Sequence, residues 1–494
     1  MKISSDTRRF LTAAMAVTAA VALAACKSTP PAVAAAPAPV ATPTKPPAET
    51  PKPADKKEFS RLEFATELDK LLAARKYDEA VASFDSVPES ETSSIPMLKI
   101  KLAVLISASR LDEATAVAER LEKAAPTDAD VLYSRSILAG ARGDQAAKAK
   151  YLTRTIQAEP DHSDAHTSLG LGKLSSGDYE GAKAHFVRAS AANPANTDAL
   201  LGLARVYYMK EDLPRARDTL DAALEKETRH GSIWAERARV RSETGDLPGA
   251  IQDARKAVEL EPLVYGNWVD MGTYYISAGK KRDAREAFGE AIKIDPAQYL
   301  AYIYRAGLND DLENTDEAVA DYRMVCKLYP RYYYAAEALG ILLWGKGDYA
   351  GSRDAFRLAL THSPNNPYYA LLYALCYFRE GKNAEGKEFM ANYIKTMNRE
   401  STEYFLCRLF VDKSGEADVL NRITKEKKAV ARNRMLFYAA EYYDIFQNKD
   451  IAQKYYLEII ATPSPSFFEY RLSKWAVTRP ENANGKTGGD SPKS

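Results

Sequence analysis

The 494-residue sequence predicts an all-α protein, in which short helices form repeated pairs that stack into a solenoid. Three observations support this fold class. Small residues recur every 34 residues, prolines recur with the same period, and apolar residues within one period are spaced by three or four. The last spacing places apolar side chains on one face of a helix. One helical pair cannot bury such faces alone, so neighbouring pairs must pack together.

Small residues occupy one position of the period along most of the chain. The series runs Ala80, Ala114, Ala182, Ala216, Ala250, Ala284, Ala318, Ser352 and Gly386, and only Lys148 interrupts it. A second series consists of Pro126, Pro160, Pro194, Pro262, Pro296, Pro330 and Pro364. Proline has no backbone N–H and does not continue a helix, so each proline is predicted to lie at the boundary between two units.

The unit 265–298 shows how one period is expected to fold. Its apolar residues follow a helical spacing in each half, at Trp268, Met271, Tyr275, Phe288 and Ile292. Gly279 separates the two halves, and glycine adopts turn conformations at low cost. Glycine recurs at the same place as Gly143, Gly177, Gly245, Gly347 and Gly381. We therefore expect a helix, a tight turn and a second, antiparallel helix in each unit.

This unit resembles the tetratricopeptide repeat in length and in chemistry. The residues that carry the resemblance are Trp268, Gly272, Tyr275, Ala284, Phe288, Ala291 and Pro296. Units in the same register begin at Arg61, Ile95, Ala129, Ser163, Thr197, Gly231, Tyr265, Tyr299, Tyr333 and Pro367. The resemblance implies a right-handed superhelix of about 11–12 helix-turn-helix units. In that family the first helix of each unit lines a concave groove.

The register divides the chain into segments. The in-register array covers residues 59–400, and the register fails over 401–432, which is expected to be an irregular helical unit. A final repeat-like unit and a capping helix are predicted over 433–478, with Phe467, Phe468 and Trp475 in the capping helix. Residues 479–494 are rich in Gly, Pro, Asn and Lys and are predicted to be disordered.

The N-terminal segment is typical of an export signal. Residues 1–25 contain a basic start and then a short alanine-rich apolar run, which is too short for a comfortable membrane span. The sequence Leu23-Ala24-Ala25-Cys26 resembles the lipobox of bacterial lipoproteins. The resemblance implies that the Cys26 thiol carries lipid and becomes the new N-terminus, which would anchor the chain to a membrane by its acyl chains.

Residues 26–58 are predicted to be a disordered tether. The stretch 27–58 holds nine prolines and eight alanines, and extended proline-rich chain would reach at most roughly 100 Å from the membrane. The residue after Cys26 is Lys27 rather than aspartate. By resemblance to the sorting rule of diderm bacteria, this favours the outer membrane, with the protein facing the periplasm.

Charge and composition argue against several classes of function. The net charge is +1, and residues 1–25 carry three basic side chains and one acid, so the remainder is near neutral at −1. A near-neutral chain lacks the basic surface that nucleic-acid binding needs. His162 and His166 are four residues apart, yet no third ligand follows at a suitable spacing, so no metal site is predicted. No catalytic motif occurs, and we predict neither an enzyme nor a cofactor.

The cysteines are too few for a disulfide framework. Besides Cys26 the chain has Cys326, Cys376 and Cys407. Free, buried thiols are favoured, because a cysteine within a helical pattern usually packs as a small hydrophobe. A bridge between Cys376 and Cys407 stays open as an alternative.

Helical geometry selects the residues that would line the groove. Positions two, five, nine and twelve of a unit point away from the packing between its two helices. The candidate partner-binding residues are Arg205, Tyr208, Arg239, Tyr334, Glu337, Ile341, Trp344, Tyr368, Leu371, Leu375 and Phe378. The C-terminal members form an aromatic and aliphatic stripe of the kind that protein interfaces favour. The alternative is that these side chains pack inside the stack or against residues 401–432.

These features predict a membrane-anchored scaffold that binds a protein or peptide of the bacterial cell envelope. The alternative is an accessory protein that binds a cell-wall or polysaccharide ligand. Exposed aromatic faces accompanied by carboxylates, in place of aliphatic pockets, would favour that alternative.

Overall fold

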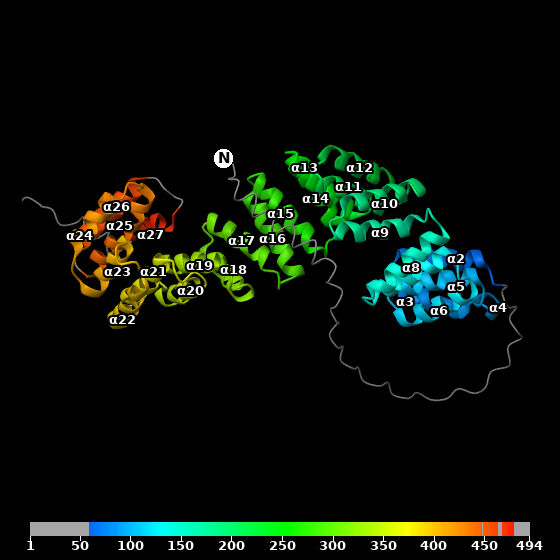
Figure 1. The fold of residues 1–494 in the computed structure, drawn as a ribbon, viewed down its shortest axis with the longest axis horizontal. Coiled ribbons are helices and arrows are strands. Elements are labelled where there is room, and N and C mark those ends of the chain that lie inside the picture. The colour runs from blue at the N-terminus through cyan, green and yellow to red at the C-terminus, as the bar shows by residue number, and fades with distance from the viewer. Residues whose placement is uncertain (1–58, 447, 463–466, 479–494) are drawn as a thin grey trace, which may run out of the picture. The chain divides into compact units, whose positions relative to one another are not determined.

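The computed structural model describes residues 59–446, 448–462 and 467–478, and helices are the only regular elements among them (Figure 1). The prediction of an all-α solenoid of helical pairs is confirmed, since consecutive helices pack together in pairs along the chain. The predicted signal peptide, the lipid-bearing Cys26, the tether and the C-terminal tail lie outside the described residues.

Contacts divide the chain into two compact units, Met1–Leu260 and Glu261–Ser494. The helices of the first unit are α2 (Arg61–Ala73), α3 (Tyr77–Ala82), η1 (Ser83–Ser86), α4 (Glu89–Thr92), α5 (Ile95–Ser107), α6 (Leu111–Ala124), α7 (Ala129–Ala141), α8 (Gln145–Ala158), α9 (Ser163–Ser175), α10 (Tyr179–Ala192), α11 (Thr197–Met209), α12 (Leu213–Lys226), α13 (Gly231–Glu243) and α14 (Leu247–Leu260).

The second unit continues the same alternation. Its helices are α15 (Tyr265–Ser277), α16 (Lys281–Ile294), α17 (Tyr299–Asp311), α18 (Thr315–Leu328), α19 (Tyr333–Gly345), α20 (Tyr349–His362), α21 (Pro367–Arg379), α22 (Asn383–Tyr393), η2 (Ile394–Thr396), α23 (Thr402–Asp412), α24 (Glu416–Lys425), α25 (Ala429–Phe446), α26 (Lys449–Ala461) and α27 (Phe468–Thr478). From α5 to α22 the odd-numbered helix is the first of each pair.

Aromatic rings of the second helices explain why the first helices carry small residues. Phe288 on α16 is fully buried, and a Cβ added at Gly272 on α15 would lie 2.7 Å from its ring. A Cβ added at Gly170 on α9 would lie 2.7 Å from the ring of Phe186 on α10 of the same pair, and one added at Gly202 of the next pair would lie 2.3 Å from it. A larger residue at these glycines would push the two helices apart.

The turn inside each pair uses a left-handed backbone at the same position of the period. Gly279 has φ 72°, and the other five predicted turn glycines also have positive φ. Where the sequence lacks glycine the conformation persists, with Glu211 at φ 61° and Glu313 at φ 62°. Each such residue directly follows the C-cap residue of the first helix, a position where a left-handed residue closes the last carbonyls. The fold therefore imposes this backbone even on residues that disfavour it.

The segment with failed register is helical. It forms α23 and α24, which are shorter than most helices of the regular pairs, and the long helix α25 follows. Their apolar side chains join those of α19 to α22 in one large core that includes Phe410, Tyr438 and Tyr442. The C-terminal part of the second unit is thus a continuous core rather than a row of similar layers.

The closing helix α27 is present, and its position differs from that of a simple end cap. It packs on α26 and α25 and also contacts α19, which lies several pairs earlier in the chain. Leu472 and Ala476 of α27 are fully buried in the C-terminal core. In a linear repeat array each unit contacts only its neighbours, so α27 departs from that rule by lying along the first helices.

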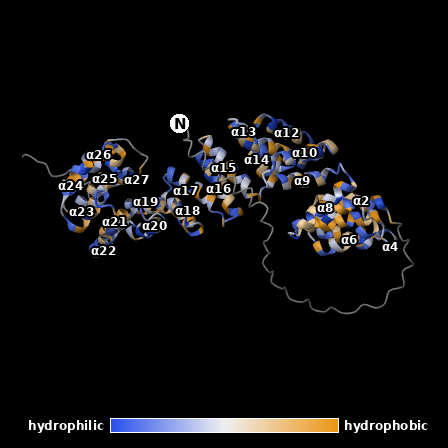
Figure 2. Ribbon diagram, in the orientation of Figure 1, coloured by the Kyte–Doolittle hydropathy of each residue, from blue (hydrophilic) through white to orange (hydrophobic). Residues whose placement is uncertain are grey.

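Figure 2 shows apolar and hydrophilic residues interspersed along the helices of both units. No helix among the described residues is long and apolar enough to cross a membrane. Lys148, which interrupts the small-residue series, lies with its aliphatic stem against Gly140, 3.2 Å from the place of a Cβ there. This is the arrangement expected of a long side chain that covers apolar surface while its ammonium stays in water.

Candidate functional site

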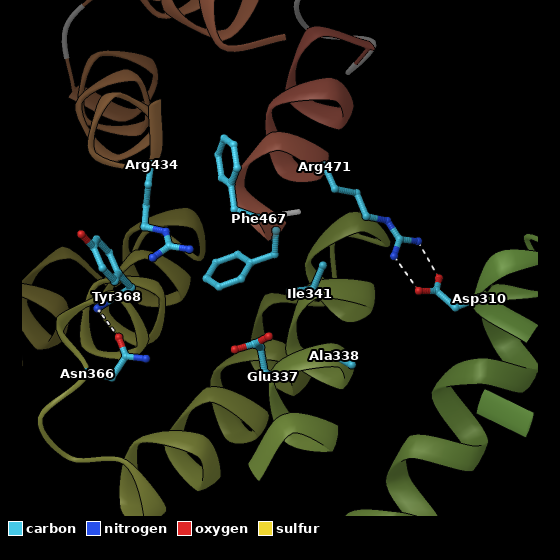
Figure 3. A pocket seen from close by; sticks show the side chains of 10 residues that line it. Asp310, Glu337, Ala338, Ile341, Asn366, Tyr368, Arg434, Phe467 and Arg471 are labelled. Carbon is cyan, nitrogen blue, oxygen red and sulfur yellow. Dashed lines mark hydrogen bonds and ion pairs between the residues drawn. The ribbon is translucent and has the colours of Figure 1, made fainter. Parts of the chain in front are cut away.

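A pocket of about 410 Å³ lies between α27 and the helices α17, α19 and α21, each of which is the first helix of its pair (Figure 3). We call it the C-terminal pocket. It is lined by Asp310, Glu337, Ala338, Ile341, Asn366, Tyr368, Arg434, Phe467, Phe468 and Arg471. Glu337, Ile341 and Tyr368 are predicted groove residues, so the structure brings three of them together in one site.

Arg434 of α25 stacks on an aromatic ring at one side of the pocket. Its guanidinium lies 4.9 Å from the ring centre of Tyr368, which itself stacks on Tyr438 with centroids 5.7 Å apart. The same guanidinium faces Glu469 of α27, with Arg434 Nε 3.4 Å from Glu469 Oε2. A cation held over a ring and beside a carboxylate is fixed in place, and Figure 3 shows it directed toward the cavity.

Glu469 is a fully buried carboxyl. The Tyr438 hydroxyl donates to its Oε1 at 3.0 Å. Burial raises the pKa of Glu469 to about 7, although Arg434 and Tyr438 favour the charged form. Desolvation therefore outweighs the nearby cation, and α27 carries an acid that is costly to bury when ionised.

Glu337 of α19 lies in the floor of the pocket. Burial raises the pKa of this carboxyl, and a hydrogen bond from the Tyr369 hydroxyl together with the charge of Arg434 opposes the rise. Asn366 caps α21, accepting from the Tyr368 N–H at 3.1 Å. These groups give the pocket both donors and acceptors beside apolar surface.

Arg471 of α27 closes the other side of the pocket. Its guanidinium donates two hydrogen bonds to Asp310 of α17, of 2.7 Å to Oδ2 and 2.6 Å to Oδ1. The two residues are 161 positions apart. A planar two-point contact of this kind fixes orientation as well as distance, so it sets where α27 lies across the first helices.

The expectation of an exposed apolar stripe is corrected by the structure. Ile341, Trp344, Leu371, Leu375 and Phe378 are all buried in the C-terminal core. Phe378 stacks on Phe410 of α23 at 5.6 Å, so residues 401–432 cover part of the stripe, as the alternative interpretation held. Of this set only Ile341 also lines the pocket.

Tyr334 remains at the surface with 51% of its area exposed. Its ring lies 4.3 Å from that of Tyr333 and 5.7 Å from that of Tyr332. Nearby, Tyr329 stacks on Tyr299 at 4.6 Å. The ends of α17, α18 and α19 thus carry a cluster of tyrosines, Tyr299, Tyr329, Tyr332, Tyr333 and Tyr334, which we call the tyrosine cluster.

The predicted groove residues of the first unit form a separate arrangement. Arg205 of α11 and Arg239 of α13 both bind Glu236, with Nε to Oε1 2.7 Å and Nη1 to Oε2 2.8 Å. Although burial alone would raise the pKa of Glu236, Arg239 and Arg205 hold it below its usual value. Tyr208 is half-buried on α11. Arg205 thereby ties α11 to α13 of the next pair through one buried carboxylate, and Arg239 binds the same carboxylate from within α13.

His162, His166 and His185 make hydrogen bonds that stabilise α9 and its surroundings. His162 Nδ1 accepts from the Ala165 N–H at 3.3 Å and so caps α9. His166 Nε2 donates to the Pro160 carbonyl at 2.8 Å, which leaves its Nδ1 as the acceptor for His185 at 2.9 Å. Over the residues that the structure describes, no group of three or more His, Cys, Asp or Glu side chains is placed to hold a metal ion.

The three cysteines of the described segments are free thiols. Cys376 and Cys407 are both buried, and burial raises the pKa of each thiol. The bridge between them that the sequence left open is not present.

Sequence reasoning missed Arg434 and Arg471 as site residues. Neither lies in the 34-residue register, and their place depends on how α25 and α27 fold over α19 and α21. The aromatic pair Phe467 and Phe468 was a usable signal, since two adjacent large rings after the last unit indicate a surface to cover.

Both units are built from stacked helical pairs, which defines the class of the protein as an α-helical repeat solenoid. Tetratricopeptide repeat family models match residues 173–240, 269–333 and 337–387. Tetratricopeptide repeats are therefore confirmed within these residues. Arrays of this kind mediate protein–protein interactions and are typically not enzymes.

Similar proteins share parts of the array. The human Superkiller complex protein 3 is 26% identical over 132 residues, which are 26% of this chain and 8% of that protein. The TPR repeat-containing protein MJ1428 of Methanocaldococcus jannaschii is 22% identical over 346 residues, covering 69% of this chain and 57% of its own length. The chain thus spans under two thirds of either relative. The Pseudomonas aeruginosa pilF structure aligns with a TM-score of 0.37 at 21% identity, covering 46% of this chain and 98% of that one.

Proposed function

We propose that this chain is a membrane-anchored scaffold that binds a protein of the bacterial cell envelope through its repeats. The observation that carries the proposal is the C-terminal pocket on the first helices of a tetratricopeptide array. Its lining combines aromatic rings with an arginine held over Tyr368. Aromatic residues and arginine are the residue types that contribute most to protein recognition.

The anchor in this proposal is Cys26, and it rests on the sequence Leu23-Ala24-Ala25-Cys26. Acyl chains on one cysteine would hold the chain at the membrane, and Lys27 favours the outer membrane facing the periplasm. The proline-rich stretch 27–58 would hold the repeats away from the lipid surface. In this arrangement the array meets its partner within reach of the membrane.

The anchor is tested by metabolic labelling with a radioactive fatty acid in a bacterial host. The full chain is expected to be labelled and to partition into detergent, and Cys26→Ala is expected to lose both properties. Cys326→Ala is the matched control, because Cys326 lies on α18 and its loss should leave the label in place. Equal labelling of Cys26→Ala and the parent chain would refute the anchor.

The binding role is tested by crosslinking in cells. A photo-crosslinking amino acid at position 334, on the exposed edge of the tyrosine cluster, is expected to capture a specific envelope protein. The same amino acid at exposed Leu171 of α9 is the control, and it should capture a different set of proteins or none. The same adducts at both positions, or none at either, would count against a scaffold.

The tyrosine cluster supports a second candidate function, binding of a cell-wall or polysaccharide ligand. Tyr329 and Tyr334 are 40% and 51% exposed, and the neighbouring rings hold them in place. Flat, exposed rings of this kind offer stacking surfaces to sugar rings. Co-sedimentation with purified peptidoglycan that falls on Tyr329→Ala and Tyr334→Ala together would support this role, and unchanged co-sedimentation would exclude the cluster as its site.

A further inference from the structure

Two histidines face each other between α9 and α10, the two helices of one pair in the first unit (Figure 1). Nδ1 of His166 on α9 lies 2.9 Å from Nδ1 of His185 on α10, and the centroids of the two rings are 5.2 Å apart. We propose that this pair is a binding site for a divalent transition metal ion, with copper(II) preferred, coordinated by both Nδ1 atoms. Such a site would be independent of the protein partner and of the membrane anchor.

His166 already presents the unprotonated nitrogen that a metal ion needs. It occupies the position of the 34-residue period that tryptophan occupies in two later units, at Trp234 and Trp268. Each indole N–H, which can only donate, donates to the carbonyl six residues earlier at 2.9 Å. His166 Nε2 makes the same contact with the Pro160 carbonyl at 2.8 Å, so the proton of His166 lies on Nε2. A histidine that binds a metal usually donates its other ring N–H to such an oxygen, which fixes the ring.

The ion would take the place of one proton. Because the proton of His166 lies on Nε2, the hydrogen bond between the two Nδ1 atoms is donated by His185. His185 is half-buried, and moving its proton from Nδ1 to Nε2 provides the second lone pair without changing the charge of the ring. Binding of an ion by the neutral pair therefore releases no proton.

The spacing of the two nitrogens selects among metal ions. Two nitrogens bound at a right angle lie about 2.9 Å apart when each metal–nitrogen bond is about 2.05 Å, whereas a tetrahedral angle needs about 3.35 Å. The 2.9 Å between the two Nδ1 atoms fits the right angle. Copper(II) and nickel(II) favour that angle and zinc favours the tetrahedral one, and copper(II) stands highest in the affinity order of these ions. Each lone pair has to point about 45° from the line between the nitrogens, so the half-buried ring of His185 rotates on binding.

The charges around the pair leave it able to bind a cation. Burial lowers the pKa of His185, as do the other histidine of the pair and two cations, Lys173 and Arg188, while Asp178 opposes them. The lowered pKa keeps the His185 ring neutral, which is the form that binds metal. Lys173 is paired with Asp178 at 2.9 Å, and Arg188 is paired with Asp161 at 2.8 Å. Each cation is thus offset by a carboxylate, and neither repels an incoming ion with its full charge.

The protein supplies two ligands to this site. Over the described residues, no third His, Cys, Asp or Glu side chain joins His166 and His185 in a group that could hold a metal ion. Water would therefore fill the remaining positions around the ion, on the side of the half-buried His185 ring.

The site is tested by isothermal titration of CuCl2 into the full mature chain at pH 7, in a buffer that does not bind copper. His185→Gln removes one ligand. His166→Trp removes the other and keeps a ring N–H for the Pro160 carbonyl, as Trp234 and Trp268 do in their own units. Each variant is expected to weaken the tightest copper binding at least tenfold. His362→Gln is the matched control, since His362 is exposed on α20, and it should bind copper as the parent chain does.

Three further measurements distinguish coordination by the pair from adventitious binding. Electron paramagnetic resonance of the copper-loaded parent chain should show coupling to two imidazole nitrogens, and His185→Gln should lose that signal. NiCl2 should bind more weakly than CuCl2, and ZnCl2 more weakly still. Saturating CuCl2 should raise the urea midpoint of the parent chain and leave that of His185→Gln unchanged, because the ion joins α9 to α10 only in the parent. Circular dichroism checks that each variant keeps its helices, and the half-buried His185→Gln carries the test if His166→Trp unfolds the pair.

Three outcomes would overturn the site. Equal copper binding by the parent chain, His185→Gln and His166→Trp would place the ion elsewhere in the chain. Zinc binding as tight as that of copper would contradict the right-angle geometry. An absence of copper binding, with a lower urea midpoint for His185→Gln than for the parent, would leave the pair as a hydrogen bond between two helices and nothing more. Capture of a partner at position 334 tests the proposed function separately and is unaffected by any of these results.

Discussion

Replacing Glu469 by glutamine should remove most of the pH dependence of the docking of α27 between pH 5 and 8. The carboxyl is fully buried, and burial raises its pKa from 4.5 to about 7. Glutamine keeps an oxygen that accepts the hydrogen bond from Tyr438, so the change removes the ionisation together with the charge that faces Arg434. The variant thus isolates the cost of burying a charged carboxylate.

The sign follows from the direction of the shift. A folded-state pKa above the unfolded value means that the folded protein binds the proton more tightly. The contribution of Glu469 to the stability of the folded state is therefore fully present below about pH 4.5 and is lost as the pH rises through 7. A shift of this size corresponds to roughly 3 kcal/mol, at 1.36 kcal/mol per pKa unit. The parent α27 should be held less firmly at pH 8 than at pH 5 by up to that amount.

Hydrogen exchange of the α27 amides at pH 5 and 8, corrected for the intrinsic exchange rate, measures this difference as a free energy of opening. Glu469→Gln should show similar values at both pH values. Glu458→Gln on α26 is the matched control, since Glu458 is exposed, and it should follow the parent chain. The same pH dependence in the parent chain and in Glu469→Gln would refute the reasoning.

Three other outcomes follow from the repeats and the buried thiols. Gly272→Ala brings a methyl group within 2.7 Å of the Phe288 ring and should destabilise the second unit by roughly 1–2 kcal/mol in urea unfolding, whereas Gly266→Ala, with no atom within 4 Å of the added Cβ, should be neutral or stabilising. Glu313→Gly relieves a left-handed non-glycine residue at φ 62° and should raise the unfolding midpoint, with a gain of about 1 kcal/mol; a lower midpoint would contradict the role of the turn. The Cys407 thiol, buried and with a raised pKa, should react with a thiol reagent only in denaturant, and fast labelling of the native chain would show that α23 opens readily.

The sequence was sufficient for the parts of the fold that repeat. A period of 34 residues predicts the helical pairs, the turn at Gly279 and the close approach of helices at Gly272, because each of these depends on residues within one unit or the next. The left-handed backbone at Glu313 was not predicted, since the residue type at that position gives no sign of it. There the neighbouring helices impose a conformation that the local sequence disfavours.

The candidate site was predicted only in part, for a physical reason. Helical geometry places Tyr368 and Trp344 on the same side of their helices, and it does so correctly for any helix in the array. Whether that side is exposed to solvent depends on α23, α25 and α27. These helices have no periodic register, and they pack on α19 and α21, which come earlier in the chain. Trp344 is covered and Tyr368 lines a pocket because of contacts between residues far apart in the chain.

The contact between Arg471 and Asp310 also affects how the second unit folds. A row of helical pairs with local contacts can gain structure one pair at a time as the chain emerges. Here the last described helix binds a residue 161 positions earlier, so that contact forms only after nearly all of the unit has been made. Closing so long a segment costs chain entropy, which makes this step late and slow relative to the pairing of adjacent helices. Loss of the residues from Phe467 onward would remove no regular repeat, yet it would expose the core surface that Leu472 and Ala476 cover, so the final dozen described residues stabilise helices far earlier in the chain.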